Sequence, residues 1–244
     1  SQFWKMKNEA HEFGVTAKSV ECDLAKMQEW KQGIVKKLTT GVQGLLKANG
    51  VEVLKGTASF KDGKTVELVS SSGKETITAD NFVIATGSRV AQIPTLPFNG
   101  KNIISSTEAL SLKELPKEMV VIGGGFIGIE IGTVYAKLGS KVTIVEALDQ
   151  LLATVDSELV SVVQKKMKHF GITIHTGAKA LGVKEKDPAK ASQLNLEIET
   201  KEKTKQSISA DVILVSVGRK PNSENMGLEK LGIKMDPRGN IITN

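Results

Sequence analysis

A glycine-rich turn lies between an apolar strand and a helix in the predicted structure of this chain, and it limits the possible folds to a few. Met119–Ile122 is an apolar run typical of a buried strand, and Gly123–Gly128 (GGGFIG) follows it in a GxGxxG spacing. The pattern then predicts a helix over Phe126–Leu138 and a second apolar strand over Lys141–Val145, which finishes at Glu146. A strand, a glycine turn, a helix and a second strand in this order predict a βαβ unit with a parallel sheet.

Each glycine of the GxGxxG pattern has a distinct structural role. Gly123 permits the tight turn out of the strand, Gly125 leaves room for a pyrophosphate against the backbone, and Gly128 lets the helix pack close to the sheet. The N-terminus of the helix offers unpaired N–H groups and a partial positive charge to phosphates. We therefore predict a dinucleotide-binding site; the alternative is a glycine turn used only for packing.

Two acids refine this prediction. Glu146, at the tip of the second strand, can accept hydrogen bonds from the adenosine ribose, and its charge would repel a 2′-phosphate. Ala147 and Leu148 follow it and offer no arginine, so NAD is favoured over NADP. Glu130 lies near the start of the helix, where the helix dipole alone explains an acid. It would nevertheless be disfavoured beside a pyrophosphate, which makes it a candidate for the nicotinamide end.

The first half of the chain predicts a long helix and then short strands. Asp23 caps a helix with an apolar stripe, which Asn49-Gly50 ends. The stripe comprises Leu24, Met27, Ile34, Val35, Leu38, Val42, Leu45 and Leu46. Strands are predicted over 51–54, 56–61, 65–70 and 75–78, with a hairpin at Asp62-Gly63, and a buried apolar strand over Asn81–Ala85. Residues 89–117, with three prolines and a short helix over 105–112, indicate a connection between domains.

The second half continues the α/β pattern. Asp156 caps a helix through His169. Its inward residues are predicted to be Leu159, Val162, Val163 and Met167. Strands are predicted over 172–175, 179–185, 193–200 and 205–208. A second fully buried strand over Asp211–Val217 precedes a turn at 218–222, and a short helical piece is expected near 227–231.

Composition excludes several classes of protein. The net charge of +6 comes from scattered lysines, and the chain has only three arginines, which argues against a nucleic-acid footprint. The longest apolar stretch, Met119–Ala136, contains Glu130 and five glycines, which argues against a membrane span. Cys22 is the single cysteine and the three histidines lack HExxH spacing, so we expect no disulfide and no metal site. The charged N-terminus does not resemble a signal peptide.

Several motifs resemble those of the pyridine nucleotide-disulfide oxidoreductases, flavoenzymes with two dinucleotide sites. The motifs are VVIGGGFIGIE, VTIVE, FVIATGS and SVGRKPN. Two further stretches, ISSTEALSL and GLEKLGIKMDPRGNI, resemble the dihydrolipoamide dehydrogenase branch of that family. The resemblance covers essentially the whole chain. It implies a Rossmann-like α/β NAD-binding domain over 116–244, built of a parallel sheet plus an antiparallel β meander, preceded over 1–115 by the latter part of an FAD-type α/β domain.

The resemblance also implies two sets of cofactor-binding residues. For NAD these are Gly123, Gly124, Gly125, Phe126, Ile127, Gly128, Ile129, Glu130, Glu146, Ala180 and Gly218. Among them, Glu130 would reach toward the nicotinamide, Glu146 would bind the ribose, and Ala180 would lie by the adenine. For FAD the implied residues are Gly56, Thr86, Gly87 and Ser88.

The family's other motifs are not in this chain. Its first strand with a GxGxxG for FAD, its CxxxxC redox disulfide, its second FAD motif and its catalytic His-Glu pair are all missing. We therefore expect an internal fragment that contains no catalytic residue and lacks the lipoamide reaction.

The resemblance implies a parent enzyme that oxidises dihydrolipoamide and passes electrons through FAD to NAD. Such a parent would be a homodimer that meets the lipoyl domain of a 2-oxoacid dehydrogenase complex in the cytoplasm, or in the mitochondrial matrix of a eukaryote. Two alternatives stay open: another flavoenzyme of this superfamily, such as an NADH oxidase or a reductase, and a non-enzymatic NAD-binding module.

Overall fold

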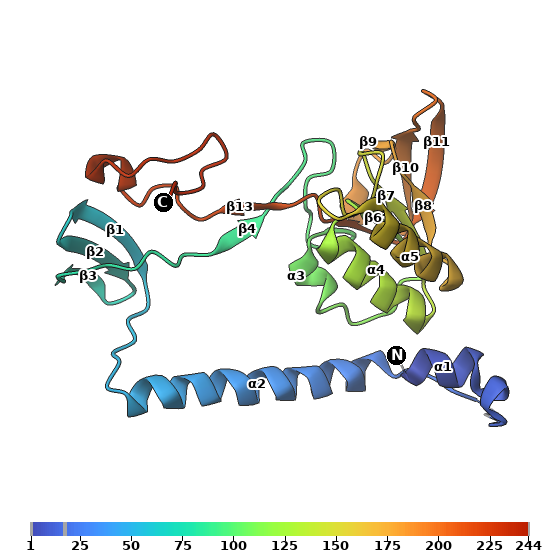
Figure 1. Ribbon diagram of the computed structural model, residues 1–244, viewed down its shortest axis with the longest axis horizontal. Coiled ribbons are helices and arrows are strands. Elements are labelled where there is room, and N and C mark those ends of the chain that lie inside the picture. Colours follow the sequence, from blue (N-terminus) through green and yellow to red (C-terminus); the bar gives the residue numbers. More distant parts are fainter. Residues whose placement is uncertain (1, 17–18, 244) are drawn as a thin grey trace. The chain divides into compact units, whose positions relative to one another are not determined.

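The computed structural model describes residues 2–16 and 19–243, which form two compact units (Figure 1). The first unit comprises Ser1–Gln32 and Val90–Gly218, and the second comprises Gly33–Arg89 and Arg219–Asn244. The expected α/β class is confirmed, because a parallel sheet and antiparallel sheets occur together with helices.

A five-stranded sheet forms the centre of the first unit, in the order β5-β12-β6-β7-β8. Every neighbouring pair is parallel. The strands are β5 (Ile103–Ile104), β6 (Glu118–Ile122), β7 (Lys141–Val145), β8 (Thr173–His175) and β12 (Val212–Val215). The βαβ unit predicted from the glycine turn is confirmed as β6, α4 (Phe126–Leu138) and β7. Parallel pairing buries both faces of the sheet, which explains why β6, β7 and β12 are nearly continuous apolar runs.

Helices cover one face of this sheet (Figure 1). They are α3 (Ser106–Ala109), α4 and α5 (Ser157–His169). Asp156 caps α5 as predicted, since its Oδ1 accepts the N–H of Glu158 at 2.9 Å.

The predicted inward face of α5 is wrong in part. Leu159 and Val162 are 62% and 65% exposed, whereas Val160 and Met167 are buried and Val163 packs partly against the core. Residues 160, 163 and 167 are spaced by three and four and so share one face of the helix. Because each residue turns a helix by about 100°, Leu159 and Val162 lie beside that face.

The predicted antiparallel meander covers the opposite face of the sheet (Figure 1). It consists of β9 (Lys179–Val183), β10 (Leu194–Glu199) and β11 (Lys205–Ala210), in the order β11-β10-β9. A short 3-10 helix, η2 (Pro188–Lys190), lies between β9 and β10. Leu194, Leu196 and Ile198 alternate along β10 toward the sheet and are fully buried. The first unit therefore has three layers: helices, parallel sheet and meander.

The N-terminal segment contains α1 (Gln2–Asn8), η1 (Ala10–Phe13) and α2 (Leu24–Ala48). The sequence of residues 1–20 predicts the end of a helix followed by a loop; of these, residues 1 and 17–18 lie outside the described residues. The predicted helix is confirmed at α2, and Asp23 Oδ1 accepts the N–H of Lys26 at 3.0 Å. Along α2 only Leu24 is buried. The predicted stripe is exposed at Ile34, Val35, Leu38, Val42 and Leu45.

The second unit contains a three-stranded meander in the order β1-β2-β3. Its strands are β1 (Thr57–Asp62), β2 (Thr65–Ser70) and β3 (Gly73–Thr78). The hairpin predicted at Asp62-Gly63 is confirmed, because β1 and β2 pair antiparallel. Phe60 and Val66 form a small core with Leu228 of η3 (Leu228–Leu231), the helical piece expected near 227–231.

Two predicted strands do not form. Residues 51–54 and 81–85 have no strand pairing in the part of the chain that the structure describes, and Val83 is 92% exposed. A strand needs a neighbour for its N–H and C=O groups, and neither segment finds one there. Phe82 and Ile84 instead pack partly against the core around Phe60.

A two-stranded sheet takes the place of the predicted turn at 218–222. Its strands are β4 (Ser88–Val90) and β13 (Arg219–Pro221). The Arg219 guanidinium Nε donates to Ser88 Oγ at 2.7 Å. The expected turn was wrong because the pairing partner lies far away in the sequence, beyond the reach of local patterns.

Candidate dinucleotide-binding site

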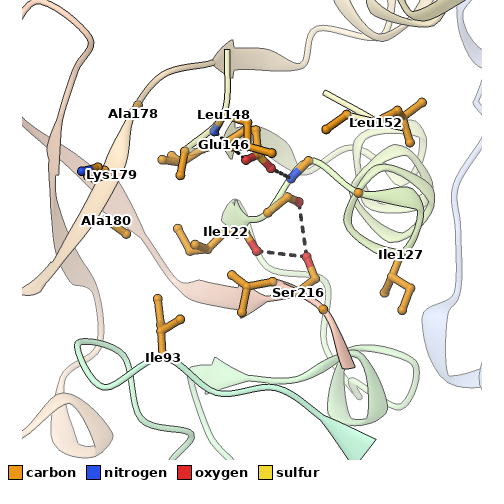
Figure 2. Close-up of a pocket in the computed structure, with 18 of the residues that line it drawn as sticks. Ile93, Ile122, Ile127, Glu146, Leu148, Leu152, Ala178, Lys179, Ala180 and Ser216 are labelled. Atoms are coloured by element: carbon orange, nitrogen blue, oxygen red, sulfur yellow. Dashed lines mark hydrogen bonds between the residues drawn. The ribbon is translucent and has the colours of Figure 1, made fainter. Parts of the chain in front are cut away.

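A cavity of about 740 Å³ opens where β6, β7 and β12 end (Figure 2). Its lining includes residues 122–127, 145–148, 178–180 and 216–218, together with Ile93 and Thr95. The chain passes from β6 through α4 to β7 on one side, whereas β12 adjoins β6 on the other. The cavity therefore lies at the carboxyl ends of parallel strands where the strand order reverses, which is the usual ligand position in open α/β sheets.

The glycine turn has the predicted geometry. Gly123 adopts a φ of +104°, and a β-carbon on it would lie 2.5 Å from the Ser216 carbonyl oxygen. A β-carbon on Gly128 would lie 2.2 Å from the Gly123 carbonyl oxygen. Gly125 is different, because a β-carbon there meets nothing within 4 Å. Gly123 and Gly128 are thus required by packing, whereas Gly125 faces open space in the cavity.

Gly125 is also the N-cap of α4. The first N–H groups of a helix have no partner within the helix and carry a partial positive charge. A bare backbone in front of such a helix end can receive an anion at close range. The residues present therefore fit the diphosphate of a dinucleotide.

Glu146 lies at the end of β7 and faces the glycine turn (Figure 2). Its Oε2 accepts the N–H of Gly124 at 2.6 Å, and its Oε1 accepts the N–H of Leu148 at 2.8 Å. A carboxylate has about four acceptor positions, so these two bonds leave capacity for ribose hydroxyls.

Ser216, directly after β12, is a site residue that the sequence analysis missed. Its hydroxyl lies 3.0 Å from the Ile122 carbonyl oxygen and 3.4 Å from that of Gly123, and it donates to them (Figure 2). The available signal was a small polar residue inside the apolar run 211–217, which marks the place where a buried strand ends.

The structure brings together most of the predicted NAD residues. Those that line the cavity are Gly123, Gly124, Gly125, Phe126, Ile127, Glu146, Ala180 and Gly218. Gly128 and Ile129 are buried in α4 behind the turn. Glu130 lines a different hollow of about 380 Å³, together with Trp30 and Val134.

The predicted FAD residues lie in the second unit. A β-carbon on Gly56 would lie 2.5 Å from the Val69 carbonyl oxygen, so a packed backbone explains this glycine. Thr86 Oγ1 donates to the Asn222 carbonyl oxygen at 2.7 Å, and the Asn222 N–H donates to the Gly87 carbonyl oxygen at 3.0 Å. Ser88 accepts from Arg219. Thr86, Gly87 and Ser88 are thus held by residues 219–222.

Two observations concern other classes of site. Across residues 2–16 and 19–243, no three His, Cys, Asp or Glu side chains gather as a metal ion would require. Within the same residues, the helices lack the combination of length and hydropathy that crossing a bilayer demands.

The parallel sheet, the glycine turn and the helix after it form a Rossmann-like α/β fold. Residues 4–244 match the model of the pyridine nucleotide-disulphide oxidoreductases, and the chain belongs to this family.

Two curated relatives are similar to this chain in sequence. The dihydrolipoyl dehydrogenase of Geobacillus stearothermophilus is 44% identical over 241 residues, which are 99% of this chain and 50% of the relative. The dihydrolipoamide dehydrogenase of Chaetomium thermophilum is 44% identical over 232 residues, 94% of this chain and 45% of the relative. The chain thus spans about half the length of these relatives.

Solved structures share the fold at low sequence identity. LpdA of Mycobacterium tuberculosis superposes with a TM-score of 0.81 at 20% identity, over 96% of this chain and 50% of that one. The HOCl-induced flavoprotein disulfide reductase RclA of Escherichia coli gives a TM-score of 0.76 at 22% identity, over 99% of this chain and 52% of that one.

Proposed function

We propose that this chain is the NAD-binding portion of a flavoprotein dihydrolipoamide dehydrogenase. The identity of 44% to enzymes of that name supports the particular enzyme. The open space at Gly125, in front of the N-terminus of α4, is the observation that carries the dinucleotide assignment. Glu146 in the cavity lining supports NAD over NADP, since its negative charge would repel a 2′-phosphate.

Different residues of the cavity bind different parts of the NAD molecule. The N–H groups at the start of α4, from Gly125 to Ile127, bind the diphosphate. Glu146 binds the adenosine ribose, Ala180 lies beside the adenine, and the backbone at Gly218 passes close to the cofactor. Bound NAD⁺ supplies a hydride acceptor at its nicotinamide ring. Glu130 is assigned to the nicotinamide end from the family resemblance alone.

The remaining assignments concern the intact parent. From the family resemblance we assign residues 116–244 to the NAD domain and 1–115 to part of an FAD domain. The compact units divide the chain differently, since residues 90–218 belong to the first unit and residues 33–89 and 219–244 to the second. Residues 81–85 pair with no strand among the described residues, so this chain does not by itself complete an FAD-binding fold. FAD, with Gly56 and Thr86–Ser88 near it, therefore belongs to the parent. We likewise assign to the parent a homodimer, a lipoyl-domain partner and a location in the cytoplasm or the mitochondrial matrix.

Titration calorimetry with NAD⁺ tests the proposal. The chain should bind NAD⁺, and Gly125→Val should abolish binding, because the new side chain fills the space assigned to the diphosphate. The fold of this variant should be intact, since a β-carbon at Gly125 touches nothing within 4 Å.

Gly44→Val provides the matched control, because Gly44 on α2 has equally open surroundings and does not line the cavity. It should leave the affinity for NAD⁺ unchanged. Unchanged affinity in Gly125→Val would refute the loop assignment.

A further inference from the structure

We propose that Glu146 has a second task besides contacting the sugar: it holds the glycine turn in its binding shape before the ligand arrives. The proposal rests on the proposed function in that the turn is taken to bind a diphosphate. Glu146 acts on that ligand group only through Gly124, and in this task it is a positioning residue.

The peptide groups of Gly124 carry the argument. The Gly124 N–H donates to Glu146 Oε2 at 2.6 Å, and the Gly124 carbonyl oxygen accepts the N–H of Leu152 at 2.9 Å. Both partners belong to the connection between β7 and α5. The middle glycine of the turn is therefore tied on both sides to the segment that follows the neighbouring strand.

Close packing supports these bonds. A β-carbon on Gly124 would lie 2.3 Å from Leu151 Cδ2 and 3.2 Å from Glu146 Oε2. The backbone of the turn thus lies directly against Glu146 and Leu151, and a side chain in place of Gly124 would force the Leu151 side chain to shift. Glu146 Oε1 also accepts the Leu148 N–H, so one carboxylate joins the turn to the start of the following connection.

This arrangement has a consequence for the diphosphate. Because the Gly124 N–H is already used by Glu146, the diphosphate takes N–H groups from Gly125 onward. The direction of the Gly125 N–H depends on the two peptides on either side of Gly124. The Glu146 carboxylate holds the first of them through the Gly124 N–H, and the Leu152 N–H holds the second through the Gly124 carbonyl oxygen. A preorganised turn binds more tightly, because less ordering is left to the binding step.

Glu146→Gln tests the proposal, since an amide has one acceptor oxygen where the carboxylate has two. Amide hydrogen exchange, followed by NMR on the 244-residue chain without ligand, reports on the turn itself. Adenosine and NAD⁺ titrations then separate the sugar contact from the effect on the diphosphate. Asp149→Asn is the matched control, because Asp149 is an acid of the same connection that pairs with Lys201 and not with Gly124.

We expect Glu146→Gln to accelerate exchange of the Gly124 amide by roughly tenfold or more, the scale of losing one charge-assisted hydrogen bond. Its affinity for NAD⁺ should fall by more than its affinity for adenosine. Asp149→Asn should change neither the exchange rate of the Gly124 amide nor the affinities for adenosine and NAD⁺. If Glu146→Gln fails to fold, Glu146→Asp shortens the reach while keeping the charge and takes its place.

Two results overturn the proposal: an unchanged exchange rate at Gly124, or equal losses of affinity for adenosine and NAD⁺. Equal losses would mean that Glu146 contacts the sugar alone. If the unsubstituted chain bound neither ligand, the proposed function would fail, while the exchange rate at Gly124 would still decide whether Glu146 orders the turn.

Discussion

At the scale of single residues, the four glycines of residues 123–128 are explained by different physical causes. Gly123, Gly124 and Gly128 each lie where a β-carbon would come within 2.5 Å of another atom of the chain, and Gly125 does not. Packing therefore explains three of the four without any ligand. Only Gly125 keeps a space that the folded chain does not use itself, and the functional argument depends on that space.

The choice between the two pyridine nucleotides also depends on one residue. Glu146→Arg replaces a charge that repels a 2′-phosphate with one that binds it. We expect the ratio of the NADP⁺ to the NAD⁺ dissociation constant to fall by about 100-fold, measured by calorimetry. Lys141→Arg, at the opposite end of β7, controls for added guanidinium and should leave the ratio unchanged. Equal ratios before and after Glu146→Arg would count against Glu146 as the ribose acceptor.

At the scale of elements, α5 shows how burial decides the cost of a substitution. Leu159 and Val160 are neighbours in sequence, yet Leu159 is 62% exposed and Val160 is 2% exposed. Val160→Ala should lower the free energy of unfolding by about 1–3 kcal/mol, through lost burial and the cavity left behind. Leu159→Ala, although it removes more atoms, should lower it by less than about 0.5 kcal/mol. Urea unfolding of both variants measures the difference, and equal costs would contradict the observed orientation of α5.

Tyr135 joins α4 to α3 and makes this contact sensitive to pH. It is 4% exposed, and its hydroxyl donates to the Ala109 carbonyl oxygen at 2.5 Å. Burial raises the pKa of Tyr135 to about 12. The pKa in the unfolded chain is about 10, so the folded state holds this proton more tightly. Its stabilising effect is complete below about pH 10 and is lost as the pH rises toward 12.

The comparison of the unsubstituted chain with Tyr135→Phe isolates this effect. Near neutral pH the variant should be less stable by about 1 kcal/mol, because the Ala109 carbonyl loses its donor. Above about pH 10 the unsubstituted chain loses stability, on the order of 2 kcal/mol, that Tyr135→Phe cannot lose, so the gap should close and reverse. Urea unfolding at several pH values measures the gap, and a constant gap would refute burial as the cause.

At the scale of the whole molecule, the sequence predicts the first unit better than the second. In the first unit each strand of the βαβ pattern has its partner nearby in the sequence, so β6, α4 and β7 begin and end close to where the pattern indicates. Local patterns predict hairpins equally well, as at β1 and β2.

Apart from the inward face of α5, the wrong predictions share one physical origin: the presence or absence of a partner distant in the sequence. Residues 51–54 and 81–85 have the composition of strands, but composition does not supply a partner, and the described chain offers none. The pairing of β4 with β13 shows the converse, because a partner distant in sequence makes a strand of residues that read as a turn. The role of Ser216 was missed for a related reason, since its bonds go to carbonyls of β6 and the turn after it.

One contact within the first unit has a consequence for how such a module can be moved. The Ala91 N–H donates to the Gly218 carbonyl oxygen at 3.0 Å, so residues 90–218 start and finish at the same spot. A stretch whose entrance and exit coincide can be inserted into a host polypeptide without pulling the host's own ends apart.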